Sequence, residues 1–85
     1  MPPIVIYTTA TCPFCMSAKR LLTKKHAQFE EIRVDVEPQR RQEMIARANG
    51  SYTVPQIFIG EKHIGGCDDL QELEFEGKLD ALLAG

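Results

Sequence analysis

The stretch "TATCPFC", residues 9–15, follows the apolar run "IVIYT" of residues 4–8, and the junction between them determines the fold that the sequence predicts. Ile4 to Tyr7 is a continuous apolar run rich in β-branched residues, which is typical of a central strand buried on both faces. Pro13 suits the first turn of a helix, because its missing N–H needs no partner there. We therefore predict a helix over Pro13–Lys25. Its core-facing residues would be Ala18, Leu21 and Leu22.

Two further segments extend this pattern into a β-α-β unit. "EEIRVDV", residues 30–36, alternates between apolar and polar side chains and predicts an edge strand with Ile32, Val34 and Val36 on its buried face. A strand, a helix and a second strand in this order imply a right-handed crossover between parallel strands. "EPQRRQEMIARANG", residues 37–50, then predicts a second helix that Gly50 ends.

The last third of the chain predicts a hairpin and a helix. In "QIFIGEKHI", residues 56–64, the pair Gly60-Glu61 offers the positive φ that a two-residue type II′ turn needs at its first position. In "DDLQELEFEG", residues 68–77, Asp68 and Gln71 resemble a capping box and Gly77 suits a helix end. We expect an α/β fold, a four-stranded mixed sheet flanked by helices in the order β-α-β-α-β-β-α. Residues 1–85 are expected to form one domain.

Composition excludes several classes of protein. The chain has 85 residues and is 44% hydrophobic, which is enough for one small core. Its net charge of −2 lacks the basic character of a nucleic-acid-binding protein. It contains neither a basic leader nor an apolar stretch approaching the ~20 residues of a membrane-spanning helix. Its three cysteines do not suit a secreted disulfide framework. We expect a soluble, cytoplasmic protein that binds neither nucleic acid nor membrane.

The cysteine pair predicts redox chemistry. Cys12 would lie at the N-terminal end of the first helix and Cys15 one turn later, so that both side chains share a face and can form a disulfide. The free N–H groups and the dipole at a helix N-terminus favour a thiolate over a thiol at Cys12. The thiolate is the nucleophile of disulfide exchange, and Cys15 can attack the mixed disulfide that Cys12 forms.

Two other interpretations of the cysteines compete with redox exchange. A zinc site would recruit Cys12, Cys15, Cys67 and His63, but zinc-binding pairs usually lie on turns rather than around a helix-initiating proline. An inert buried thiol suits Cys15 better than Cys12, which would lie at the mouth of a helix. Redox exchange is favoured, and we expect no bound metal.

Three blocks of sequence together resemble the glutaredoxin family, in particular its small bacterial dithiol members. These blocks are "TCPFC" at residues 11–15, "TVPQIFI" at 53–59 and "HIGGCDDL" at 63–70. The resemblance implies a thioredoxin fold and a monomer that reduces protein disulfides and glutathionylated thiols, with Cys12 as the nucleophile and Cys15 as the resolving thiol. Glutathione would be the reducing co-substrate, without a tightly bound cofactor. Disulfide-bearing or glutathionylated proteins would be the partners, ribonucleotide reductase among them.

The resemblance also implies a glutathione site. The sequence alone favours a trans bond before Pro55, since only ~5–6% of X-Pro bonds in folded proteins are cis, whereas the resemblance implies a cis bond. The cysteinyl part of glutathione would then pair with the Val54 backbone, and its γ-glutamyl carboxylate would meet the N–H groups that open the last helix. The binding residues would be Thr53, Val54, Pro55, Gly66, Cys67 and Asp68. Supporting residues would be Thr9, Thr11, Pro13 and Phe14.

This sequence departs from the family pattern at a few positions. Relatives often carry a lysine at the position of Thr9, where it meets the glycine carboxylate of glutathione. They also often carry an arginine or glutamine before the "TVP" block, so that Arg40, Arg41 or Tyr52 would have to compensate here. Phe14 replaces the more usual tyrosine and keeps an aromatic wall beside the sulfur.

Remaining residues and functions receive simpler interpretations. His26 and His63 are predicted to be surface or turn residues without a partner, and Cys67 a bystander thiol. An iron–sulfur carrier that shares Cys12 between two chains is a rival function, which Pro13 disfavours within the family. A thioredoxin-type reductant is a second rival, but it would leave the "GGCDD" block without a purpose.

Overall fold

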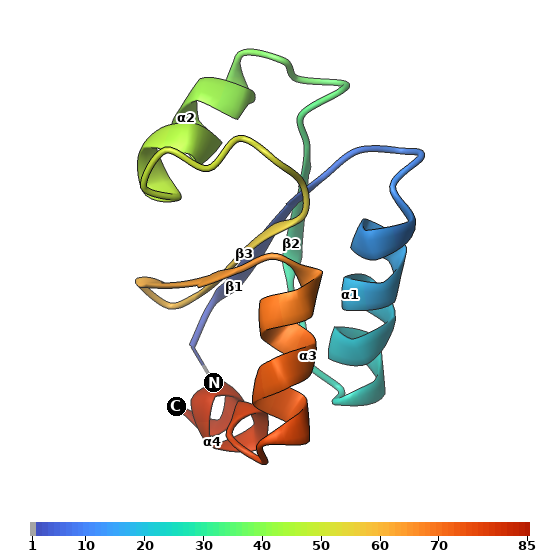
Figure 1. The fold of residues 1–85 in the computed structure, drawn as a ribbon, viewed down its shortest axis with the longest axis vertical. Coiled ribbons are helices and arrows are strands. Elements are labelled where there is room, and N and C mark those ends of the chain that lie inside the picture. Colours follow the sequence, from blue (N-terminus) through green and yellow to red (C-terminus); the bar gives the residue numbers. More distant parts are fainter. Residues whose placement is uncertain (1) are drawn as a thin grey trace.

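The computed structural model describes residues 2–85, and its centre is a four-stranded sheet with the strand order β2-β1-β3-β4 (Figure 1). The strands are β1 (Ile4–Thr8), β2 (Glu30–Arg33), β3 (Gln56–Ile59) and β4 (Lys62–Gly65). β1 pairs with β2 in parallel and with β3 in antiparallel orientation, and β3 pairs antiparallel with β4. The predicted mixed sheet, with residues 4–7 as a central strand and β2 at an edge, is therefore confirmed.

The helices cover both faces of this sheet. They are α1 (Pro13–Lys24), α2 (Arg40–Arg47), α3 (Cys67–Phe75) and α4 (Leu79–Ala84). Figure 1 shows α1 and α3 side by side, with α2 apart from them. Met44 and Ala48 of α2 pack against the other face of the sheet. No helix within residues 2–85 is long and apolar enough to cross a membrane.

Two clusters of buried side chains lie on opposite faces of the sheet because strand side chains alternate. In β1, Ile4 and Ile6 belong to the larger cluster, whereas Tyr7 belongs to the smaller one. The larger cluster also contains residues of α1, α3 and α4, namely Ala18, Leu21, Leu22, Cys67, Leu70, Leu79 and Leu83. The smaller cluster contains Ile32, Val34, Phe58 and, from α2, Met44 and Ala48. The predicted inward face of the first helix is confirmed.

The second strand is shorter than predicted. It ends at Arg33, where the N–H groups of Val36 and Glu37 both turn back to the Arg33 carbonyl at 3.2 and 2.9 Å. Val34 is still buried, but Val36 is 66% exposed, so the predicted alternation fails at its last position. The following helix likewise begins at Arg40 rather than at residue 37, because a turn occupies residues 37–39.

The C-terminal part contains one helix more than the sequence predicted. Gly77, with φ +74°, ends the preceding helix as expected, but residues 79–84 then form α4 and bury Leu79 and Leu83. The segment is too short to show a helical period of its own. Its helical state depends on packing against the larger cluster.

The hairpin turn is as predicted, and the helix cap is not. Ile59 pairs with Lys62 across a two-residue turn in which Gly60 has φ +62°. α3 begins at Cys67, and its first turn is capped by Asp69, whose carboxylate accepts the Gly66 N–H at 2.9 Å. The predicted cap at Asp68 with Gln71 is therefore wrong by two residues, because the N-cap is Gly66 and the helix begins before the acidic pair.

Candidate active site

Cys12 is the N-cap residue of α1, and its sulfur fills the role that a serine oxygen usually has. The residue is extended, with φ −108° and ψ 105°, and its Sγ accepts the backbone N–H of Cys15 at 3.1 Å. Pro13 occupies the first helical position, as predicted. A sulfur that accepts a hydrogen bond at a helix N-terminus is better suited to carry negative charge, because both the donor and the dipole favour the anion.

The two cysteines of the pair have different surroundings. Cys12 is 9% exposed and its thiol lies 3.8 Å from the Val54 carbonyl, to which it donates. Cys15 is only 1% exposed, and its burial, followed by its hydrogen bond to Cys12, raises the pKa of the Cys15 thiol to about 12. Cys12 is therefore the thiol that an incoming disulfide can meet, and Cys15 remains protonated behind it.

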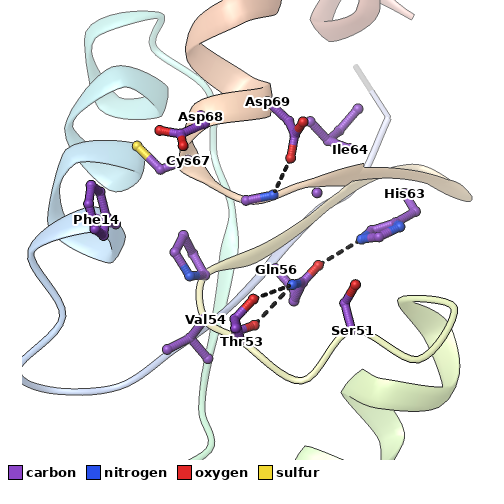
Figure 2. Close-up of a pocket in the computed structure, with 13 residues that line it drawn as sticks. Phe14, Ser51, Thr53, Val54, Gln56, His63, Ile64, Cys67, Asp68 and Asp69 are labelled. Atoms are coloured by element: carbon purple, nitrogen blue, oxygen red, sulfur yellow. Dashed lines mark hydrogen bonds between the residues drawn. The ribbon is translucent and has the colours of Figure 1, made fainter.

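A pocket of about 530 Å³ opens beside Val54 (Figure 2). One wall is the segment Ser51–Gln56, the other is the end of β4 together with the start of α3, and Phe14 stands at one side. The remaining lining residues are His63, Ile64, Gly65, Gly66, Cys67, Asp68 and Asp69. The pocket thus combines residues from the second and third sequence blocks with Phe14 from the first.

The Thr53–Pro55 wall presents free backbone groups. The Val54–Pro55 bond is cis, as the family resemblance implied. Within residues 2–85, the Thr53 and Val54 amides donate no hydrogen bond to the protein. An added peptide strand can pair with free N–H groups of this kind.

The opposite wall ends in the N-terminus of α3. The first helical backbone bond runs from Leu70 to the Gly66 carbonyl, so the amides of Cys67 and Asp68 have no backbone partner within the described part of the chain. Gly65 has φ +115°, and a Cβ there would overlap the Asp69 carboxylate. Gly66 differs: its φ is −92°, and a Cβ would meet only the Pro55 carbonyl, at 3.5 Å. Of these two residues, only Gly65 has a backbone conformation that requires glycine. At residue 66 the lack of a side chain keeps the pocket open.

The structure brings most of the predicted site residues to this pocket, but not all of them. Thr53, Val54, Pro55, Gly66, Cys67, Asp68 and Phe14 line it. Thr9, Thr11, Cys12, Pro13 and Cys15 are not among the lining residues, and Cys12 meets the pocket wall through its contact with the Val54 carbonyl. Thr9 and Thr11 flank Ala10, whose N–H donates to the Asp35 carboxylate at 3.1 Å. Arg33 donates two hydrogen bonds to the same carboxylate and holds the pKa of Asp35 well below the usual range. The ionised Asp35 side chain therefore anchors the loop before Cys12.

One of the three candidate replacements for the missing family residues contacts the segment that leads into the pocket wall. Arg41 donates to the Tyr52 carbonyl at 2.8 Å, directly before the Thr53–Pro55 segment. Arg40 instead pairs with Glu43 at 3.1 Å. Tyr52 is 68% exposed. Of the three residues, Arg41 is the one whose guanidinium group is held against this wall by a hydrogen bond.

His63 contradicts its prediction. Its Nε2 lies 2.7 Å from Gln56 Oε1 (Figure 2). Its ring stacks on Phe58 with the centroids 4.9 Å apart. The sequence contained a signal for this pair, since a two-residue turn at Gly60-Glu61 places residues 58 and 63 opposite each other and residue 56 diagonally across from 63. His26 is the exposed turn residue that was predicted, with φ +59°.

The zinc set considered from the sequence is not assembled. Within residues 2–85, no three His, Cys, Asp or Glu side chains come together in a way that could hold a metal ion. Cys67 is 6% exposed, and burial raises the pKa of its thiol. All three cysteines are free thiols.

Known proteins resemble this chain over nearly its whole length. A protein-family model for glutaredoxin matches residues 4–64. A glutaredoxin of Pseudomonas aeruginosa is 62% identical over 84 residues, which cover 99% of both chains. Glutaredoxin 3 of Escherichia coli is 52% identical over 83 residues, covering 98% of this chain and 99% of that one. A crystal structure of a buckwheat glutaredoxin–glutathione complex superimposes with a TM-score of 0.89 at 34% identity, covering 98% of this chain and 77% of that one.

Fold, cysteine pair and similarity agree on a class: a thiol–disulfide oxidoreductase with the thioredoxin fold. Within that class the chain belongs to the glutaredoxin family, and its activity is glutathione-dependent thiol–disulfide exchange.

Proposed function

We propose that Cys12 is the attacking thiolate and Cys15 the resolving thiol in the reduction of glutathionylated thiols and protein disulfides. The observation that carries the assignment is the 3.1 Å hydrogen bond from the Cys15 N–H to Cys12 Sγ at the start of α1. That bond favours the anion at Cys12, whereas burial keeps Cys15 protonated. Cys12 is therefore the thiol that attacks first, and Cys15 reacts only in the later, resolving step.

With a glutathionylated protein the exchange needs Cys12 alone. Its thiolate attacks the glutathione sulfur, the disulfide bond between that sulfur and the protein's sulfur breaks, and the protein leaves as a thiolate that takes a proton from water. A second glutathione, as thiolate, attacks the sulfur of the bound glutathione. Oxidised glutathione leaves and the Cys12 thiolate is regenerated, so that one free glutathione is consumed and the disulfide passes from the protein to the pair of glutathiones.

With a protein disulfide the second cysteine is required. Cys12 attacks one sulfur, releases the other as a thiol and stays joined to the substrate. Cys15 then loses its proton, attacks Cys12 Sγ and expels the remaining substrate thiol. Two glutathiones in succession reduce the Cys12–Cys15 disulfide to two thiols. This order agrees with the deeper burial of Cys15.

Glutathione would lie in the pocket beside Val54. Its cysteinyl part would pair with the Val54 backbone, whose N–H is free, and its γ-glutamyl carboxylate would accept the N–H groups of Cys67 and Asp68. The Cys12 thiol at 3.8 Å from the Val54 carbonyl is then within reach of the ligand's sulfur. Phe14, 62% exposed, would form the apolar side wall.

Partners and location are part of the same proposal. The open pocket suits an extended peptide as well as glutathione, so disulfide-bearing or glutathionylated proteins would be substrates, with ribonucleotide reductase as a candidate from the family. A protein that depends on reduced glutathione would work in the cytoplasm, where thiols are kept reduced.

The test is turnover of a mixed disulfide between glutathione and 2-mercaptoethanol, with and without free glutathione, for the wild type and for Cys12→Ser. We expect turnover only when glutathione and Cys12 are both present. Cys67→Ser is the matched control and should retain activity, since its sulfur takes no part in the exchange. Turnover by Cys12→Ser would disprove the assignment, and equal turnover without glutathione would indicate another reductant.

A further inference from the structure

The Thr53–Val54 peptide carries one of the free N–H groups of the pocket, and the fold holds this peptide from one side only. Within residues 2–85 the Val54 N–H donates to no protein group, whereas the Thr53 carbonyl accepts the Gln56 side-chain amide at 3.0 Å. The same amide nitrogen lies 3.4 Å from Thr53 Oγ1. The Thr53–Val54 peptide is therefore held by a side chain rather than by pairing with another strand.

The peptide plane links that grip to the ligand. The Thr53–Val54 bond is trans, since the cis bond in the described chain is the one that follows it. In a trans peptide the C=O and the N–H point in opposite directions. Holding the Thr53 carbonyl toward Gln56 therefore turns the Val54 N–H away from the protein, where a ligand backbone can accept it.

Gln56 is itself oriented by a second residue. Its side chain is 3% exposed, and its Oε1 lies 2.7 Å from His63 Nε2 on β4 (Figure 2). Because the Gln56 nitrogen donates to Thr53, its oxygen must accept, so His63 Nε2 carries the proton. Stacking on Phe58 holds the imidazole ring in place. With Thr53 at its nitrogen and His63 at its oxygen, the Gln56 amide is held at both ends.

We infer that His63 and Gln56 are positioning residues, which act through the Thr53–Val54 peptide to present the Val54 N–H to the glutathionyl group of the substrate. Neither needs to touch the reacting sulfur. The inference rests on the proposed glutathione site. It assigns a role in substrate alignment to two residues of the β3–β4 hairpin that thiol chemistry does not require.

Two kinetic readouts separate this role from a structural one. Turnover of the glutathione–2-mercaptoethanol mixed disulfide depends on the Val54 N–H, whereas alkylation of Cys12 by iodoacetamide depends only on the thiolate and its exposure. A positioning role lowers kcat/KM for the mixed disulfide and leaves the alkylation rate and the melting temperature near the wild-type values.

The variants separate the two hydrogen bonds. Gln56→Met keeps the volume and removes the amide, and we expect kcat/KM for the mixed disulfide to fall by about tenfold, as for one lost hydrogen bond. His63→Phe keeps the stacking on Phe58 and removes the Nε2 donor, and we expect its kcat/KM for the mixed disulfide to fall by a few fold. His63→Gln places an amide nitrogen near the Nε2 position and should recover most of the loss. Gln28→Met, an exposed glutamine in the loop after α1, is the matched control and should stay within about twofold of the wild type.

Three results would overturn the inference. The first is a kcat/KM within about twofold of the wild type for both Gln56→Met and His63→Phe. The second is a parallel fall in alkylation rate, which would mean that the hairpin shapes the Cys12 environment instead. The third is a loss equal in His63→Gln and His63→Phe, which would leave His63 without a donor role. If Gln56→Met does not fold, the two His63 variants decide. Failure of the proposed function gives a different result, namely a wild type that does not turn over the mixed disulfide at all.

Discussion

The two halves of the active site are built at different ranges in the chain. The reactive half consists of Cys12, Pro13 and Cys15, and its decisive contact joins two residues of a single helical turn. The recognition half is a pocket whose walls come from the segment before β3, from β4 and from the start of α3. The halves meet at one contact, the 3.8 Å approach of Cys12 Sγ to the Val54 carbonyl.

This difference separates reactivity from recognition. A helix N-terminus generates a nucleophile from a few consecutive residues, because the free amides and the dipole are properties of any helix start. A ligand surface needs groups that converge from several elements, which only the folded sheet supplies. Variants in the first half should therefore change which exchange reactions occur, and variants in the second should change how well a glutathionyl substrate is used.

The largest effect is expected in the reactive half. Cys15→Ser should lower protein-disulfide reduction by more than about a hundredfold, because the mixed disulfide with Cys12 has no internal thiol to resolve it. Turnover of a glutathionylated substrate should persist, since glutathione itself releases Cys12. Parallel assays on a protein disulfide and on a glutathione mixed disulfide measure both. Equal losses in the two assays would show that Cys15 supports Cys12 rather than resolving it.

The next effect lies in the recognition half and concerns folding. Gly65→Ala should destabilise the protein by about 2–3 kcal/mol, since φ +115° is strained for alanine and the new Cβ overlaps the Asp69 carboxylate. Chemical or thermal unfolding of the purified variant measures this. Asp69→Ala on the same background should recover part of the loss by removing the overlap, and a lack of recovery would leave backbone strain as the whole cause.

The neighbouring glycine should behave in the opposite way. Gly66→Ala fits the backbone, and its methyl group would stand beside the Pro55 carbonyl in the pocket wall. We expect stability within about 1 kcal/mol of the wild type, together with an increase of about tenfold in KM for a glutathionylated substrate. Steady-state kinetics next to an unfolding curve tests both parts. An unchanged KM would mean that the ligand does not reach Gly66.

The smallest effect is expected when a charge is added outside the reactive half, in the loop before Cys12. Thr9→Lys adds a cation to the loop before Cys12, and we expect the thiolate fraction of Cys12 at neutral pH to rise by no more than about fivefold, as for an exposed ion pair. Ultraviolet thiolate absorbance against pH measures it, with Thr9→Gln as the uncharged control. A larger shift for the lysine variant alone would show that the helix end is not the main source of thiolate stability.

Much of this molecule was predictable from residue patterns. The first strand, the first helix and the hairpin follow from apolar runs, Pro13 and Gly60-Glu61, because each signal acts over a few neighbouring residues. The errors fall where distant contacts decide. α4 forms because Leu79 and Leu83 find the larger core cluster, and β2 ends at Arg33 because the chain turns toward Asp35 and its contact with Ala10.

The sequence by itself determined the position of Cys12, the proposed nucleophile, since a cysteine before a helix-initiating proline is placed by local geometry. The cis bond at Pro55 and the proposed glutathione residues were reached through resemblance to a family rather than from the residues alone. The tertiary structure decided the surroundings of these residues. It buries Cys15, which stays protonated, and it places Gln56, held by His63, as the donor to the Thr53 carbonyl. Local signals specify which atoms can react, whereas long-range packing specifies how a substrate is held against them.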